Sequence, residues 1–129
     1  MKQPTLLLVD DEPVLAEYLA HAARDCGFNP VTTSDDREFR DCFLEQRPDM
    51  VALDLGMPGM DGVELLRFLA EHEYRAPVLI VSGFDRRVLD SAFRLGGALG
   101  LTMIGPLEKP VRYEEVQLLL NGLRPTLAL

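Results

Sequence analysis

Residues 50–62 read MVALDLGMPGMDG, an apolar run that ends at Asp54 and passes into a loop rich in glycine and methionine. A short, continuous apolar run bounded by turn residues is typical of a parallel strand that is buried on both faces. The sequence therefore places Asp54 at the carboxyl end of a predicted central strand.

Four other short apolar runs accompany this one, and longer amphipathic stretches separate them. The predicted strand at residues 31–33 is the weakest, because Pro30 precedes it and it holds only one large apolar residue. It is therefore predicted to lie at a sheet edge. Alternating strands and helices predict an α/β fold with a five-stranded parallel sheet and helices on both faces. The predicted strands are 5–9, 31–33, 50–53, 78–81 and about 102–107, and the predicted helices are 13–26, 35–45, 62–72, 86–99 and 112–120. Pro13 suits the first turn of the first helix and Gly27 its end, Asp35 or Ser34 can cap the second helix, and Gly122 is expected to end the fifth.

Polar residues follow four of the five predicted strands. In an open parallel sheet, ligands bind beyond the carboxyl ends of the strands, next to the point where the strand order reverses. Strands must end somewhere, so one polar exit means little. Two acidic ends, a hydroxyl and one of only two lysines in the chain together favour a functional cluster over coincidence. Its members are Asp10, Asp11, Asp54, Ser82 and Lys109.

The chemistry of such a cluster follows from its charges. Crowded carboxylates resist ionisation unless a cation joins them, and an all-oxygen ligand set suits Mg²⁺. A carboxylate such as Asp54 can attack a phosphorus atom and form an acyl phosphate. Lys109 and Ser82 carry groups that can hold the remaining phosphoryl oxygens. The sequence thus predicts Mg²⁺-dependent phosphoryl transfer to a carboxylate.

Composition excludes several other classes of protein. The chain has 129 residues, which suits one domain, and a net charge of −8, which argues against binding to nucleic acid or an anionic membrane. Its apolar runs are too short to span a bilayer, so a cytoplasmic protein is expected. Cys26 and Cys42 are predicted to be reduced thiols, and His21 and His72 to be structural residues.

These motifs resemble those of response-regulator receiver domains: Asp10-Asp11 after an apolar run, Asp54 in Leu-Asp-Leu-Gly-Met-Pro-Gly-Met-Asp-Gly, then Val-Ser-Gly and Lys109-Pro110. The resemblance implies the flavodoxin-like strand order 2-1-3-4-5, with a receiver domain over 1–124 and a short tail over 125–129. It implies Asp54 as the phosphoacceptor, with Ser82 and Lys109 contacting the phosphoryl group. It implies a Mg²⁺ site formed by Asp54, by Asp11 directly, by Asp10 through water, and by the main-chain carbonyl of Gly56. A cis Lys109–Pro110 bond is also expected.

The resemblance further implies a non-enzymatic signalling module. Its phosphodonor would be a sensor histidine kinase or phosphotransfer protein, and phosphorylation would switch the surface of the fourth helix, fifth strand and fifth helix. Two alternatives stay open: a degenerate receiver acting as a phosphorylation-independent interaction domain, and a Mg²⁺-dependent phosphohydrolase with an aspartyl nucleophile. The phosphohydrolase would usually carry a general acid two residues after the nucleophile, where this chain has Gly56.

The chain departs from the family pattern in three places. Pro106 occupies the position that is usually aromatic, so the usual switch by a hydroxyl and an aromatic ring is in question. The segment 98–107 is longer than the usual link and is predicted to extend the fourth helix. Gly56 and Phe84 stand where polar side chains often tune the phosphoryl lifetime.

Residues 99–111 are also similar to receivers attached to cyclic-di-GMP phosphodiesterases, which hints at an output domain outside this chain. The leucine-rich fifth helix is compatible with a homodimer, but a stripe facing the core explains it equally well.

Overall fold

The computed structural model describes residues 3–57, 62–83 and 85–127. Five strands form one sheet in the order β2-β1-β3-β4-β5, and every neighbouring pair is parallel. The predicted fold class and strand order are therefore confirmed. The strands are β1 (Thr5–Val9), β2 (Asn29–Thr33), β3 (Met50–Asp54), β4 (Pro77–Ser82) and β5 (Thr102–Glu108); the helices are α1 (Pro13–Asp25), α2 (Asp36–Gln46), α3 (Gly62–Glu71), α4 (Arg86–Ala98) and α5 (Tyr113–Leu127).

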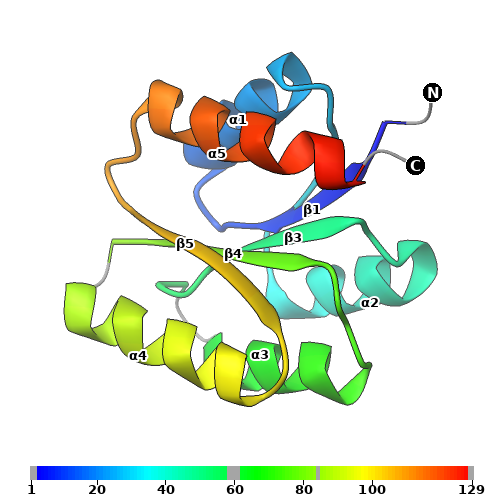
Figure 1. Cartoon of the computed structure of the whole chain (residues 1–129), viewed down its shortest axis with the longest axis vertical. Coiled ribbons are helices and arrows are strands. Elements are labelled where there is room, and N and C mark those ends of the chain that lie inside the picture. The colour runs from blue at the N-terminus through cyan, green and yellow to red at the C-terminus, as the bar shows by residue number, and fades with distance from the viewer. Residues whose placement is uncertain (1–2, 58–61, 84, 128–129) are drawn as a thin grey trace.

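The helices cover both faces of the sheet, as Figure 1 shows: α1 and α5 lie on one face, and α2, α3 and α4 on the other. Each face has its own apolar core. Alternating residues of β1 supply both, since Leu6 and Leu8 face α1 and α5 while Leu7 and Val9 face the other layer. All five residues of β3 are buried, which explains its continuous apolar sequence.

Local sequence explains where the first two helices begin and end. Pro13 occupies the first turn of α1, where its missing N–H costs nothing. Gly27 follows the helix with φ +86°, a conformation that glycine adopts without strain. The side chain of Asp35 caps α2 by accepting a hydrogen bond of 2.7 Å from the backbone N–H of Glu38. These predicted helix ends are confirmed.

The predicted end of the fifth helix at Gly122 is wrong. Helix α5 continues to Leu127, so residues 125–127, predicted to form a tail, belong to it. Leu123 and Leu127 pack against the core that α1 and α5 share, and Arg124 donates a hydrogen bond to the carbonyl of Gly27. This packing offsets the low helix propensity of Gly122 and Pro125.

The predicted extension of α4 into residues 98–107 is also wrong. The helix ends at Ala98, and Gly100, with φ +90°, turns the chain into β5. The predicted strand at about 102–107 is observed as Thr102–Glu108, and its register with β4 shifts between Leu79 and Val81. Gly105, with φ +87°, lies in this irregular part, and both Gly105–Pro106 and Lys109–Pro110 are cis, the second as expected.

Within the described part of the chain, no helix has the length and apolar character needed to cross a membrane.

Candidate functional site

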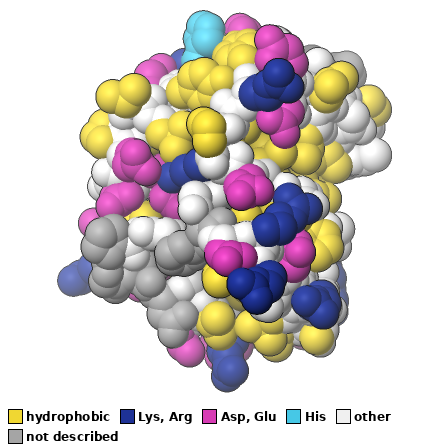
Figure 2. All heavy atoms as spheres, turned by 90° about the vertical axis from the view of Figure 1, so that its left-hand side faces the viewer, with side chains coloured by type: hydrophobic (Ala, Val, Ile, Leu, Met, Phe, Trp, Pro, Cys, Tyr) yellow, Lys and Arg dark blue, Asp and Glu magenta, His cyan; other side chains and the backbone are white. Residues whose placement is uncertain are grey.

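The carboxyl ends of the inner strands bring polar side chains into one place. Asp54 ends β3 and is 3% exposed, Asp10 follows β1 and is 2% exposed, and Ser82 ends β4 and is fully buried. Figure 2 views this side of the molecule, where acidic and basic side chains mix with hydrophobic ones. Buried strand ends hold these groups rigidly, because the flanking apolar residues are locked in both cores.

Among the described residues, four carboxylates form the acidic part of the site. Asp10, Asp11, Glu12 and Asp54 each offer one oxygen, and these four oxygens lie within 4.8 Å of one another. Asp10 and Asp54 are buried, whereas Asp11 and Glu12 are exposed at the start of α1. Such crowding is costly unless positive charge is present.

The crowding of the carboxylates changes the environment of Asp10 in particular. Its Oδ1 accepts a hydrogen bond of 2.9 Å from the backbone N–H of Glu12. Its buried Oδ2 accepts no hydrogen bond from any described residue. Burial raises the pKa of the Asp10 carboxyl above its ordinary value, and the charge of Asp54 raises it further. Asp10 thus has an oxygen ready to accept a proton donor or a cation.

Lys109 provides positive charge within the cluster. Its Nζ lies 3.1 Å from Oδ2 of Asp54, 3.1 Å from Oε1 of Glu12 and 3.5 Å from Oδ2 of Asp10. Burial alone would lower the pKa of Lys109, but the hydrogen bonds to Glu12 and Asp54 raise it above its ordinary value. The backbone N–H of Lys109 donates to the carbonyl of Ser82, which fixes the start of the β5–α5 loop against β4. Lys109 is therefore held as a cation at the carboxylates.

Gly56 leaves room beside Asp54. Its N–H donates a hydrogen bond of 2.9 Å to Oδ1 of Asp54. A Cβ at position 56 would make ordinary van der Waals contacts, 3.4 Å from that oxygen and 3.5 Å from Oγ of Ser82, so this position faces both side chains. A cavity of about 250 Å³ lies at this point, lined by Glu12, Asp54, Gly56, Gly83 and Lys109. The volume accommodates a small anion together with water.

The donor set fits a hard divalent cation. All the candidate side-chain ligands are oxygen atoms, two of the carboxylates are buried, and one buried oxygen has no hydrogen-bond donor among the residues that the structure describes. Mg²⁺ prefers carboxylate oxygens and retains several waters, which the exposed side of the cluster allows. Residues Asp10, Asp11 and Asp54 are the ones that would hold it.

The structure brings together all the side chains that the sequence singled out: Asp10, Asp11, Asp54, Ser82 and Lys109. Sequence reasoning missed Glu12, although it directly follows the acidic pair. Phe84 lies outside the described residues. His21 is exposed beside Asp25, and His72 packs on Phe43 and Phe68, so neither histidine joins the site.

An open parallel sheet with polar residues at its switch point defines the doubly wound class of α/β proteins, in which ligands bind at this edge. Comparison with known families narrows this class. Residues 6–121 match the family model of the response regulator receiver domain, and the chain belongs to that family.

Individual relatives and a solved structure support this family assignment. The chain is 39% identical over 121 residues to the probable transcriptional regulatory protein TcrX of Mycobacterium tuberculosis. This alignment covers 92% of this chain and 49% of TcrX. It is 34% identical over 108 residues to the C4-dicarboxylate transport transcriptional regulatory protein DctD of Pseudomonas aeruginosa, covering 84% of this chain and 22% of DctD. A crystal structure of a response regulator from Colwellia psychrerythraea superposes with a TM-score of 0.82 and 31% identity, covering 97% of this chain and 99% of that one.

The chain spans about half of TcrX and about a fifth of DctD.

Proposed function

We propose that this receiver domain accepts a phosphoryl group on Asp54 in a Mg²⁺-dependent reaction. The observation that carries the proposal is the position of Asp54: a buried carboxylate that faces a small cavity, with Lys109 3.1 Å from one oxygen and the Gly56 N–H 2.9 Å from the other. These donors orient the carboxylate and leave it open toward the cavity.

The donor is a phosphohistidine of a sensor histidine kinase or a phosphotransfer protein. An oxygen of Asp54 forms the new bond to phosphorus while the bond from phosphorus to the imidazole nitrogen breaks, and the nitrogen leaves with the electron pair. Asp11, Asp54 and the main-chain carbonyl of Gly56, with Asp10 acting through water, would hold Mg²⁺, which would supply positive charge for the phosphoryl oxygens. Lys109 and Ser82 lie close enough to Asp54 to contact the same oxygens.

A phosphoryl group on Asp54 adds about −1.5 to −2 charges beside Lys109 and Ser82. Both residues belong to the β4–β5 end of the sheet, where the backbone of Lys109 is bonded to that of Ser82. A shift of either one changes the loops that lead into α4 and α5, so we propose that the surface formed by α4, β5 and α5 responds. Pro106 is part-buried in β5 and has no aromatic ring to reorient, so Ile104, packed beneath α5, is the proposed apolar reporter of the change.

Gly56 argues against the phosphohydrolase alternative. It stands where that chemistry would place a general acid, and it offers none. The relatives' regulatory names favour a signalling module whose output lies in another domain or partner.

Intact mass after incubation with acetyl phosphate and Mg²⁺ tests the proposal. Wild type should gain one phosphoryl group and Asp54→Asn should gain none. Asp49→Asn, which lies just before the start of the same strand, should behave as wild type. An equal adduct on Asp54→Asn would overturn the assignment of the acceptor. No adduct on a wild type that binds Mg²⁺ would favour the phosphorylation-independent interaction domain.

A further inference from the structure

Glu12, the residue that directly precedes α1, does not cap that helix with its side chain. Glu12 occupies the N-cap position, with φ −96° and ψ 103°, where short polar side chains usually accept a hydrogen bond from the first turn. The carboxylate of Glu12 makes no such bond. It accepts instead a hydrogen bond of 3.1 Å from Nζ of Lys109, 97 residues further along the chain.

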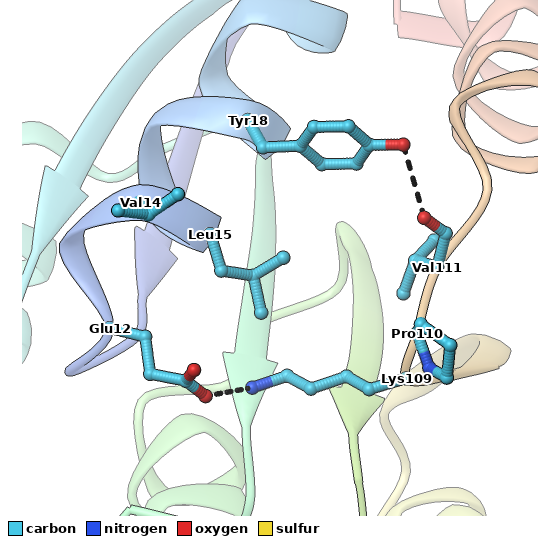
Figure 3. A pocket seen from close by; sticks show the side chains of 7 residues that line it. All are labelled: Glu12, Val14, Leu15, Tyr18, Lys109, Pro110 and Val111. Carbon is cyan, nitrogen blue, oxygen red and sulfur yellow. Dashed lines mark hydrogen bonds and ion pairs between the residues drawn. The ribbon is translucent and has the colours of Figure 1, made fainter.

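Lys109 thereby joins two carboxylates of different kinds. The distances to Glu12 and to Asp54 are both 3.1 Å, but the Glu12 side chain is 63% exposed and that of Asp54 only 4%. Figure 3 shows the Lys109 side chain extending from the β5–α5 loop toward Glu12 at the start of α1. The ammonium is thus shared between the phosphoacceptor and a carboxylate at the mouth of the site.

Glu12 and Lys109 also separate two hollows. Both residues line the acidic cavity at Asp54, and both line a neighbouring groove of about 600 Å³ whose other walls are Val14, Leu15, Tyr18, Pro110 and Val111. Their ion pair is therefore the boundary on one side of the acidic cavity. A change in the partner of Lys109 alters that boundary.

We propose that Glu12 is a positioning residue, which holds the Lys109 ammonium in the unphosphorylated protein and loses it when Asp54 is phosphorylated. The inference rests on the proposed function of Asp54. A phosphoryl group offers Lys109 several charged acceptors in place of the single Asp54 oxygen. Glu12 and the arriving group then compete for the same ammonium, so Glu12 slows phosphorylation of Asp54.

The competition has a limited size because Glu12 is exposed. Exposed ion pairs are weak and screened by salt, so replacing Glu12 by glutamine should speed phosphorylation by acetyl phosphate roughly two- to fivefold. Glu108 is the matched control: it is exposed, it precedes Lys109, and its replacement removes the same charge. An effect that passes through Lys109 must also disappear when Lys109 is replaced by alanine.

The chain has only two lysines, which allows a direct observation of Lys109. Protein labelled with ¹³C at the lysine ε-carbon gives two signals, and Lys109→Arg assigns them. In the metal-free protein, Glu12→Gln should move the Lys109 signal and Glu108→Gln should leave it in place. With Mg²⁺ and beryllofluoride bound, wild type and Glu12→Gln should show the same Lys109 signal.

The outcomes separate this inference from the proposed function. An unmoved Lys109 signal in metal-free Glu12→Gln would overturn the inference even if Asp54 is phosphorylated normally. Equal rate changes in Glu12→Gln and Glu108→Gln, or an effect that survives in the Lys109→Ala background, would also overturn it, since net charge alone would then be responsible. Absence of any phosphoryl adduct in wild type would count against Asp54 as the acceptor, while the Lys109 signal would still decide the contact with Glu12.

Discussion

The polar groups at the two ends of the central strands differ in how well they are paired. At the amino ends, polar groups are paired across the loops: Thr5 N–H donates to Oδ2 of Asp49 at 2.8 Å, Asp49 N–H donates to the carbonyl of Thr5 at 2.9 Å, and the Tyr74 hydroxyl donates to the carbonyl of Pro48 at 2.8 Å. At the carboxyl ends, carboxylates crowd together and Oδ2 of Asp10 accepts no hydrogen bond from a described residue.

One sheet therefore separates two tasks. Paired groups at the amino ends contribute to the free energy of unfolding, whereas repulsion at the carboxyl ends reduces it and leaves the site ready for a cation. Substitutions at the two ends should consequently have opposite patterns: loss of stability without loss of chemistry at one end, and altered chemistry with metal-dependent stability at the other.

Lys109→Ala should have the largest effect. It removes the cation that contacts Asp10, Glu12 and Asp54, so repulsion among the carboxylates should lower the free energy of unfolding of the metal-free protein by about 3 kcal/mol. Mg²⁺ should restore part of this loss. Urea unfolding with and without Mg²⁺ measures both values, and Lys109→Arg serves as the charge-preserving control. A loss below about 1 kcal/mol, as for an exposed ion pair, would contradict the view that this end depends on Lys109.

Asp10→Asn should weaken metal binding and stabilise the metal-free fold. Removing one buried carboxylate should lower the affinity for Mg²⁺ roughly 10- to 100-fold. Because burial and Asp54 disfavour the charged form of Asp10, asparagine should raise the free energy of unfolding at pH 7 by about 1 kcal/mol. Calorimetric titration with Mg²⁺ and urea unfolding check the two parts. A variant that lost stability would indicate that Asp10 is well paired without a metal.

Asp49→Ala tests the amino end. It leaves the part-buried N–H of Thr5 without its carboxylate acceptor, which should lower the free energy of unfolding by about 1.5 kcal/mol. Phosphorylation by acetyl phosphate should proceed at the wild-type rate under conditions where the variant is folded. A changed rate would mean that the two ends of the strands are coupled.

Tyr74→Phe should have the smallest effect, with a characteristic pH dependence. Loss of the hydrogen bond to Pro48 should lower the free energy of unfolding by about 1 kcal/mol at pH 7. Burial raises the pKa of Tyr74 well above its ordinary value of 10.0, so above that pH the unfolded chain ionises while the folded protein does not. The stabilising contribution is thus present below pH 10 and declines as the pH rises. Unfolding curves of both proteins from pH 8 to 11 should show the difference between them shrinking, and a constant difference would contradict it.

Much of this protein could be predicted from local sequence. A strand buried on both faces needs a continuous apolar run. The run from Met50 to Leu53 therefore predicted a central strand and placed Asp54 at its end. The shared edge of a parallel sheet then predicted that Asp10, Asp54, Ser82 and Lys109 would meet. Caps at Pro13, Gly27 and Asp35 act within one turn of the chain, and for that reason they were predicted correctly.

Only the tertiary structure decided the remaining features, because each depends on contacts between distant residues. Helix α5 passes through Gly122 and Pro125 because its last turns pack against the core that it shares with α1, and helix propensity does not include the energy of this packing. The fourth helix stops at Ala98 and the chain turns at Gly100, because the strand that follows pairs with β4 from Thr102 onward. Glu12 reads as an ordinary acidic residue at a helix start, and its ion pair with Lys109 exists because the fold brings together residues 97 positions apart.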